Sequence, residues 1–118
     1  MKILVVDDSG TMRRIIIRTL TDMGYSDFIE AENGQVALNA VEKGGIELII
    51  TDWNMPIMSG LEFVTQARVI EPDLPILMVT TNASNQDVIQ ALKAGVNNYV
   101  IKPFTLDTMR EKVSAILS

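Results

Sequence analysis

The strongest constraint on the fold is a strict alternation of two kinds of segment along the chain. Short apolar runs, rich in β-branched residues, alternate with longer segments whose apolar residues recur every three or four positions. The runs are Ile3–Val6, Phe28–Ala31, Leu48–Thr51, Ile76–Val79 and Tyr99–Ile101. Most of them are continuous, which is typical of strands buried on both faces, and only Phe28–Ala31 is half polar, which suits a strand nearer the edge. This alternation predicts right-handed crossovers and a parallel sheet with helices on both faces.

The helical segments carry start and stop signals. Asn33 and Thr105 are candidate N-caps, because their side chains can accept hydrogen bonds from free backbone N–H groups, and the third helical segment is expected to begin near Ser59. Gly24, Gly44-Gly45 and Gly95 are candidate helix stops. The apolar stripes comprise Met12, Ile15, Ile16, Leu20 and Met23; Val36, Ala37, Ala40 and Val41; Leu61, Val64, Ala67 and Ile70; Val88, Ala91 and Leu92; and Leu106, Met109, Val113, Ile116 and Leu117. A chain of 118 residues is too short for an eight-stranded barrel, so we expect an α/β fold with a doubly wound five-stranded parallel sheet.

Composition removes several classes of chemistry. The chain has no cysteine and no histidine, which excludes disulfides, cysteine nucleophiles, serine–histidine triads and histidine-ligated zinc. Ten basic residues against 15 acidic ones give a net charge of −5 without a basic stripe, so no nucleic-acid partner is expected. Four apolar residues and then two acids do not form a signal peptide, and no apolar run approaches the ~20 residues of a membrane span. We therefore expect a cytoplasmic protein that does not bind membranes.

Polar side chains follow the predicted strands at the points where ligands bind in sheets of this type. The first strand is followed by Asp7 and Asp8, and the third by Asp52. The fourth runs into Thr80, and the fifth is followed by Lys102. Because the carboxyl ends of parallel strands meet at one edge, these side chains are expected to lie together. Three carboxylates, hydroxyl groups and one ammonium would then share one site.

Oxygen ligands without histidine or cysteine suit a hard cation, and Mg²⁺ is favoured over Ca²⁺ because it binds through a few carboxylates, waters and a phosphate. Taken singly, each residue has a simpler interpretation. Asp7 and Asp8 could cap the next helix, Asp52 could belong to a turn, Thr80 could be a satisfied loop hydroxyl and Lys102 a solvated charge. Their joint position at strand ends favours a site that receives a phosphoryl group.

These residues belong to a longer pattern. It consists of Val5-Val6-Asp7-Asp8-Ser9, Asp52-Trp53-Asn54-Met55-Pro56 with Met58 and Gly60, Thr80-Thr81, and Lys102-Pro103-Phe104. The pattern resembles the receiver domain of two-component response regulators from end to end. Thr11-Met12-Arg13-Arg14-Ile15 and the segment from Tyr99 to Phe104 are most similar to the single-domain chemotaxis regulators of that family. The resemblance implies one receiver domain over residues 1–118, with a flavodoxin-like strand order 2-1-3-4-5 and five helices on both faces.

The resemblance also implies roles for individual residues. Asp52 would accept the phosphoryl group, while Asp7, Asp8, Asp52 and the backbone carbonyl of Asn54 would hold Mg²⁺, with Asp7 acting partly through water. Thr80 and Lys102 would bind phosphoryl oxygens, and the Lys102–Pro103 bond would be cis. The chain would be a switch that phosphorylates and slowly dephosphorylates itself, not a metabolic enzyme.

Further roles concern output and lifetime. Tyr99 would be an aromatic switch coupled to Thr80, and Ala83 and Val88, expected on one helix, would line an output face with Lys112. Asn54 and Asn82 would tune dephosphorylation. Asn82 stands where chemotaxis regulators often have an acid, and Ser9 where an aromatic residue sometimes occurs. Both departures bear on the lifetime and strength of the switch.

The expected partners are a histidine kinase of the chemotaxis type, a flagellar motor switch protein and a phosphatase, and the chain is expected to be a monomer. Two other functions remain open. One is a stand-alone receiver that acts as a phosphorelay intermediate or in another pathway. The other is a magnesium-dependent phosphohydrolase, although neither a general acid nor a cap insertion is visible.

Overall fold

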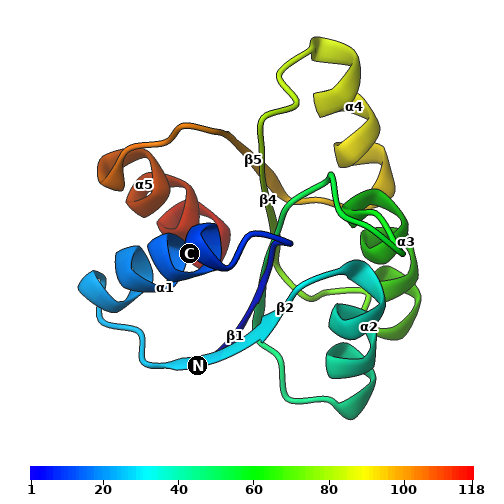
Figure 1. Cartoon of the computed structure of the whole chain (residues 1–118), viewed down its shortest axis with the longest axis horizontal. Helices are drawn as coiled ribbons and strands as arrows, with labels where there is room; N and C mark the ends of the chain where they lie inside the picture. The colour runs from blue at the N-terminus through cyan, green and yellow to red at the C-terminus, as the bar shows by residue number, and fades with distance from the viewer.

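The predicted alternation of strands and helices is confirmed in a computed structural model that describes residues 1–118 (Figure 1). The strands are β1 (Lys2–Val6), β2 (Asp27–Ala31), β3 (Leu48–Thr51), β4 (Ile76–Thr80) and β5 (Asn98–Ile101). The helices are α1 (Gly10–Asp22), α2 (Gly34–Lys43), α3 (Gly60–Ile70), α4 (Asn85–Ala94) and α5 (Leu106–Leu117). All strand pairs are parallel and the order is β2-β1-β3-β4-β5, as the resemblance implied.

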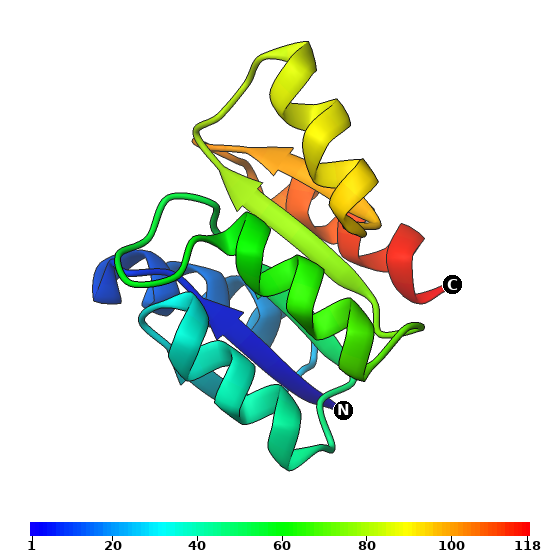
Figure 2. The same ribbon diagram turned by 90° about the vertical axis from the view of Figure 1, so that its right-hand side faces the viewer.

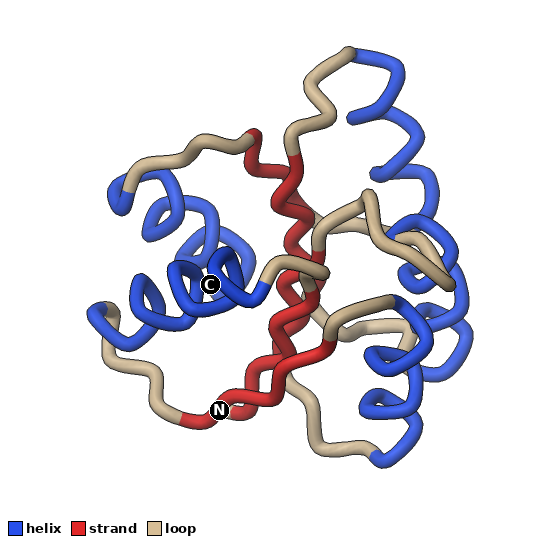
Figure 3. Tube along the Cα trace, viewed as in Figure 1, coloured by secondary structure: helices blue, strands red, loops and turns tan.

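The sheet separates two helical layers, which are seen edge-on in Figure 3. Helices α1 and α5 cover one face, and α2, α3 and α4 cover the other, which faces the viewer in Figure 2. Successive strand residues alternate between the two cores: Leu4 and Val6 pack toward α2 and α3, while Ile3 and Val5 pack toward α1 and α5. Both faces of the central strands β1, β3 and β4 are therefore buried, and these strands are apolar apart from Lys2, Thr51 and Thr80 at their ends.

The two predicted N-caps and the predicted helix start near Ser59 are confirmed. The side chains of Asn33, Ser59 and Thr105 each accept a hydrogen bond from a backbone N–H in the first turn of the helix that follows. Gly44 and Gly95 stand at the C-caps of α2 and α4. Gly24 follows the end of α1 with a φ of 102°, a left-handed conformation that favours glycine.

Several residues at the margins of the predicted apolar stripes do not lie in the core. Their side chains are at least 40% exposed, because they lie at the borders of the helix faces that meet the sheet; they are Ile15, Val36, Ile70, Leu92 and Leu106. Met23 lies just beyond α1, at its C-cap. Ala83 was expected on a helix, but Ser84 caps α4, so Ala83 belongs to the loop before it. No helix in the structure combines the length and apolar character needed to span a bilayer.

Candidate functional site

The site residues are held by hydrogen bonds that extend the sheet one step past the strand ends. The backbone N–H of Asp7 donates to Ala31 at 3.1 Å, and that of Asp52 donates to Val6 at 2.9 Å. The backbone N–H of Lys102 likewise donates to the carbonyl of Thr80 at 2.9 Å. Each functional side chain therefore leaves the sheet at a backbone position fixed by the neighbouring strand, as the topology predicted.

Three carboxylates converge at this edge. One carboxylate oxygen from each of Asp7, Asp8 and Asp52 lies within 4.8 Å of the other two. Asp7 and Asp52 are buried, at 1% and 8% exposure, whereas Asp8 is exposed. Buried carboxylates this close repel one another unless positive charge is present between them. The arrangement therefore favours the binding of a cation.

Lys102 supplies part of that charge. Its ammonium nitrogen Nζ lies 2.7 Å from Oδ2 of Asp7 and 3.2 Å from Oδ2 of Asp52. Burial lowers the pKa of Lys102, but the hydrogen bond to Asp7 and the charges on Asp52 and Asp7 outweigh it, so the pKa lies above its ordinary value of 10.5. Lys102 is thus positively charged at neutral pH, and one ammonium among three carboxylates leaves an excess of negative charge. The Lys102–Pro103 bond is cis, as expected.

Asp52 is fixed by the residues on both sides of it. Its Oδ1 accepts a hydrogen bond of 2.6 Å from the backbone N–H of Trp53, and Thr51 donates its hydroxyl to the Asp52 carbonyl at 2.9 Å. Gly60 packs so closely that a Cβ there would lie 1.9 Å from the Asp52 carbonyl oxygen, so no other residue fits. The acidic side chain is consequently held in one orientation at the floor of the site.

Asp7 has two partners that the sequence analysis did not assign. The guanidinium of Arg13 donates to the Asp7 carbonyl at 2.7 Å and pairs with Glu30 at 2.9 Å. The backbone N–H of Ser9 donates to Oδ1 of Asp7 at 2.9 Å, while the Ser9 hydroxyl accepts from Met12 as the N-cap of α1. Ser9, not Asp7 or Asp8, therefore caps the helix, which leaves both carboxylates for the site. In the sequence, the only indication that Arg13 contacts the site is its position in the first turns of the helix that follows Asp7.

A hydrogen-bonded group surrounds Asn82 at the rim. The side-chain amide of Asn54 donates to Oδ1 of Asn82 at 2.8 Å, and the Asn82 backbone N–H donates to the hydroxyl of Thr80 at 3.3 Å. The hydroxyl of Tyr99 donates to the Asn82 carbonyl at 2.7 Å. Thr80 is fully buried, whereas Tyr99 is partly exposed. The two asparagines that the sequence analysis paired by role are thus in direct contact.

The predicted output residues are distributed over three elements around β5. Ala83 is exposed in the loop before α4, Val88 is half-buried on α4, and Lys112 is half-buried on α5. Lys112 has no ion-pair partner. Figure 1 shows β5 at the edge of the sheet with α4 and α5 on its two sides. These residues therefore lie on the elements that flank one edge strand.

The donor set fits a hard divalent cation. All candidate ligands are oxygen atoms, two of the three carboxylates are buried, and their oxygens converge. Hard cations prefer such ligands, and an exposed third carboxylate leaves one side of the site open to solvent or substrate. The side-chain NH₂ of Asn54 donates to Asn82, and its backbone carbonyl has no hydrogen-bond partner, so that carbonyl oxygen is free for a cation.

Comparison with known proteins places this arrangement in a family. The model of the response regulator receiver domain matches residues 3–114. A chemotaxis protein CheY homolog of Campylobacter jejuni is 52% identical, covering 99% of this chain and 92% of the relative. CheY1 of Helicobacter pylori is 49% identical, covering 99% and 97%. The solved structure of Vibrio cholerae chemotaxis protein CheY4 superposes with a TM-score of 0.89 at 35% identity, covering 98% of this chain and 97% of that one.

Proposed function

This chain belongs to the response regulator receiver domain family and is a phosphorylation-activated chemotaxis regulator, and on that premise we propose that Asp52 is the residue that accepts the phosphoryl group. One observation carries the assignment. Asp7 and Asp52 are both buried acids in contact with Lys102, but only Asp52 follows the central strand β3, between the end of β1, which carries Asp7 and Asp8, and the end of β4, which carries Thr80. A phosphoryl group on Asp52 would therefore meet positive charge on one side and the cation ligands on the other.

The proposed reaction is a phosphoryl transfer from a phosphohistidine of a partner kinase. A carboxylate oxygen of Asp52 attacks phosphorus, the new P–O bond forms as the P–N bond breaks, and the electron pair of that bond stays on the imidazole nitrogen of the donor. A carboxylate nucleophile attacks through an oxygen that carries no proton, so the transfer needs no general base. Catalysis then rests on positioning and on neutralising the phosphoryl oxygens.

Lys102 and Thr80 would neutralise and orient those oxygens. Lys102 is already 3.2 Å from Oδ2 of Asp52 and is held in place by Asp7. The Thr80 hydroxyl accepts a hydrogen bond from the Asn82 backbone, which leaves its own proton free to donate to an anionic oxygen. Hydrolysis of the acyl phosphate by water would return the site to its starting state.

Asp7, Asp8, Asp52 and the backbone carbonyl of Asn54 would hold Mg²⁺. The ion would supply charge neutralisation at the phosphoryl oxygens, which is its ordinary role in phosphoryl transfer. Its binding would also offset the repulsion among the three carboxylates.

The proposed partners follow from the chemotaxis relatives: a histidine kinase as donor, a flagellar motor switch protein as target and a phosphatase. Output would leave through Tyr99, Ala83, Val88 and Lys112. Tyr99 supports this route, because its hydroxyl is bonded to Asn82, which is in turn bonded to Thr80. A phosphoryl group that draws the Thr80 hydroxyl toward itself would disturb that connection.

The assignment of Asp52 is tested with a small acyl-phosphate donor in Mg²⁺, followed by intact-protein mass spectrometry. We expect the unmodified chain to gain one phosphoryl group and Asp52→Asn to gain none. Asp73→Asn serves as the control, because Asp73 is an exposed acid in the loop after α3. Equal phosphorylation of Asp52→Asn and the parent chain would refute the assignment.

A further inference from the structure

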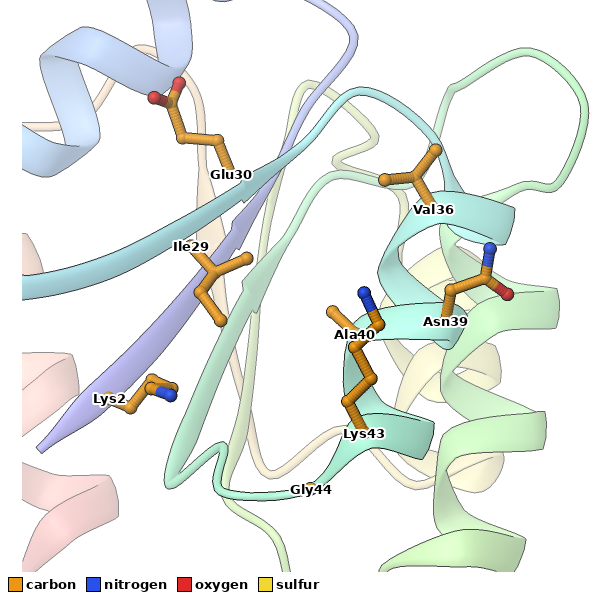
Figure 4. Close-up of a pocket in the computed structure, with 8 residues that line it drawn as sticks. All are labelled: Lys2, Ile29, Glu30, Val36, Asn39, Ala40, Lys43 and Gly44. Atoms are coloured by element: carbon orange, nitrogen blue, oxygen red, sulfur yellow. The ribbon is translucent and has the colours of Figure 1, made fainter.

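A second concave site lies away from the acidic edge, between the edge strand β2 and helix α2 (Figure 4). It has a volume of about 450 Å³, which is within the range of small-molecule sites. The residues that line it are Lys2, Ile29, Glu30, Val36, Asn39, Ala40, Lys43 and Gly44, and none of them belongs to the acid cluster. We propose that this hollow binds a small organic anion with an apolar body, such as a medium-chain or aromatic carboxylate.

The hollow carries positive charge. Lys2 and Lys43 reach the hollow from β1 and from the end of α2, and neither ammonium has an ion-pair or hydrogen-bond partner. The ion pairs of the structure join Arg13 to Glu30, and Lys102 to Asp7 and Asp52, so neither Lys2 nor Lys43 takes part in one. Two unpaired ammonium groups facing one hollow, in a chain of net charge −5, favour an anionic ligand.

The acid that lines the hollow does not neutralise them. Oε1 of Glu30 lies 2.9 Å from Nε of Arg13, so its charge is already paired. Figure 4 shows the carboxylate of Glu30 directed toward α1, away from Lys43 and Ala40. The hollow therefore keeps its positive charge.

The hollow also offers free hydrogen-bond donors. Oδ1 of Asn39 accepts a hydrogen bond of 3.1 Å from the amide of Gln35, which leaves the NH₂ group of Asn39 to donate. Apart from Oε2 of Glu30, whose carboxylate is paired with Arg13, the side-chain polar groups of the lining without partners are the NH₂ group of Asn39 and the ammonium groups of Lys2 and Lys43, which are donors. A site of donors suits a ligand whose polar end only accepts, as a carboxylate does.

Three hydrophobic side chains form an apolar wall of the hollow. Ile29, Val36 and Ala40 provide the hydrophobic part of the lining, and the Val36 side chain is 41% exposed on the hollow side of α2. Covering this surface would remove apolar area from water, which is favourable. An inorganic anion would leave the wall uncovered, so the ligand should carry an apolar body.

Helix α2 alone does not account for the arrangement. A cation in the last turn stabilises a helix C-terminus, and Lys43 fits that role. Lys2 comes from another element, and its ammonium lies beside Gly45, 3.9 Å from where a Cβ on that residue would stand. The helix end does not explain why the second ammonium and three apolar side chains face the same hollow.

The test is an NMR titration of the full ¹⁵N-labelled chain with hexanoate and phenylacetate, each compared with its neutral amide and with inorganic phosphate. We expect both carboxylates to give saturable shifts of the amide signals of Ile29, Val36, Ala40 and Gly44. The neutral amides should bind at least about tenfold more weakly, and phosphate should not saturate these signals. Lys2→Gln and Lys43→Gln should each weaken carboxylate binding about fivefold, the upper range for a half-exposed ion pair.

Two further variants separate the contribution of the ammonium groups to binding from that of the apolar side chains. Lys93→Gln is the matched control, because Lys93 occupies the last turn of α4 as Lys43 occupies that of α2, and it should leave binding unchanged. Val36→Ser keeps both ammonium groups and should still weaken binding. The same spectra report whether each variant is folded. The proposal is overturned if no carboxylate saturates these signals, if the neutral amides or phosphate bind as well, or if Lys93→Gln weakens binding as much as Lys43→Gln.

Discussion

The hydroxyl of Tyr99 donates a hydrogen bond of 2.7 Å to the backbone carbonyl of Asn82, and this bond joins β5 to the loop that follows β4. Asn82 also donates its backbone N–H to the hydroxyl of Thr80 and accepts from the side chain of Asn54. Asn82 is therefore hydrogen-bonded to Thr80, the proposed phosphoryl-binding residue, to the partly exposed side chain of Tyr99, and to Asn54 at the rim of the site. A change at Thr80 has a short physical route to Tyr99.

Tyr99 should make the stability of the fold depend on alkaline pH. Burial, followed by the charges on Asp87 and Asp52, raises the pKa of Tyr99 from 10.0 to about 12. The folded state thus holds this proton more tightly than the unfolded state does. The stabilisation is fully present below pH 10 and is lost as the pH rises through about 12.

The measurement is absorbance of tyrosinate in Tyr25→Phe, where Tyr99 is the only tyrosine, since the chain has two. We expect a midpoint near 12 in the folded protein and near 10 in denaturant. Urea unfolding of Tyr99→Phe should show a shallower loss of stability across that interval than the parent chain. A folded midpoint near 10 would contradict the structure.

Asp8→Asn should stabilise the metal-free protein. Lys102 is already shared between Asp7 and Asp52, so the exposed Asp8 adds negative charge without a partner of its own. Removing that charge should raise the free energy of unfolding in EDTA by about 1 kcal/mol, and Mg²⁺ should then stabilise the variant less than the parent. Asp107→Asn is the control, because Asp107 is favourably placed in the first turn of α5 and should give no gain. A less stable Asp8→Asn variant would instead make Asp8 a structural residue.

Asn82→Ala should shorten the lifetime of the phosphorylated state. The change removes the 2.8 Å bond from Asn54 and uncovers the rim of the site to water, so loss of the phosphoryl group should accelerate by about threefold or more. The Asn82 side chain is not part of the cluster of Asp7, Asp8 and Asp52, so the Mg²⁺ affinity of the variant should stay within about twofold of that of the parent chain. Decay of the phosphoprotein is followed by mass spectrometry, and Mg²⁺ binding by quenching of Trp53 fluorescence. An altered Mg²⁺ affinity with an unaltered decay would refute this placement.

Lys112→Glu, combined with Tyr99→Phe, should weaken binding to a flagellar motor switch peptide in the activated state. Lys112 is half-buried on α5 without an ion-pair partner, so its ammonium is free to contact a partner, and reversing its charge would remove that contact. Asp52 phosphorylation should remain intact, because neither side chain contacts the acids. Peptide affinity within error of the parent would place the output face elsewhere, and no peptide binding by the activated parent chain would favour the relay function.

The strand ends could be predicted from the sequence because each depends on a local pattern. A continuous apolar run followed by Asp7, Asp52 or Lys102 fixes where a side chain leaves the sheet, and parallel topology brings those points to one edge. N-caps such as Thr105 could be predicted as well, since they stand directly before a helical stripe. The strand order came from the family resemblance and not from these patterns.

The contacts that orient the site could not be predicted in this way. Arg13 bonds to the Asp7 carbonyl and to Glu30 because α1 and β2 approach each other only in the folded chain. The contact between Asn54 and Asn82 joins two loops 28 residues apart. The exposure of Val36 likewise depends on β2 being an edge strand, which leaves the outer part of α2 uncovered.

Gly60 offers the clearest test of close packing beneath the site, because Gly60 and Gly10 are both the first residue of a helix capped by serine. A Cβ on Gly60 would lie 1.9 Å from the Asp52 carbonyl oxygen, whereas a Cβ on Gly10 would meet only the ends of arginine side chains, at 3.4 Å or more. Gly60→Ala must therefore displace the backbone at Asp52, and its free energy of unfolding should fall by about 2 kcal/mol or more. Gly10→Ala should change stability by less than about 1 kcal/mol. Urea unfolding measures both, and phosphorylation by an acyl-phosphate donor should slow in Gly60→Ala alone, because only that change moves the acceptor carboxylate. Equal stabilities and equal phosphorylation rates in the two variants would contradict the close approach of α3 to Asp52.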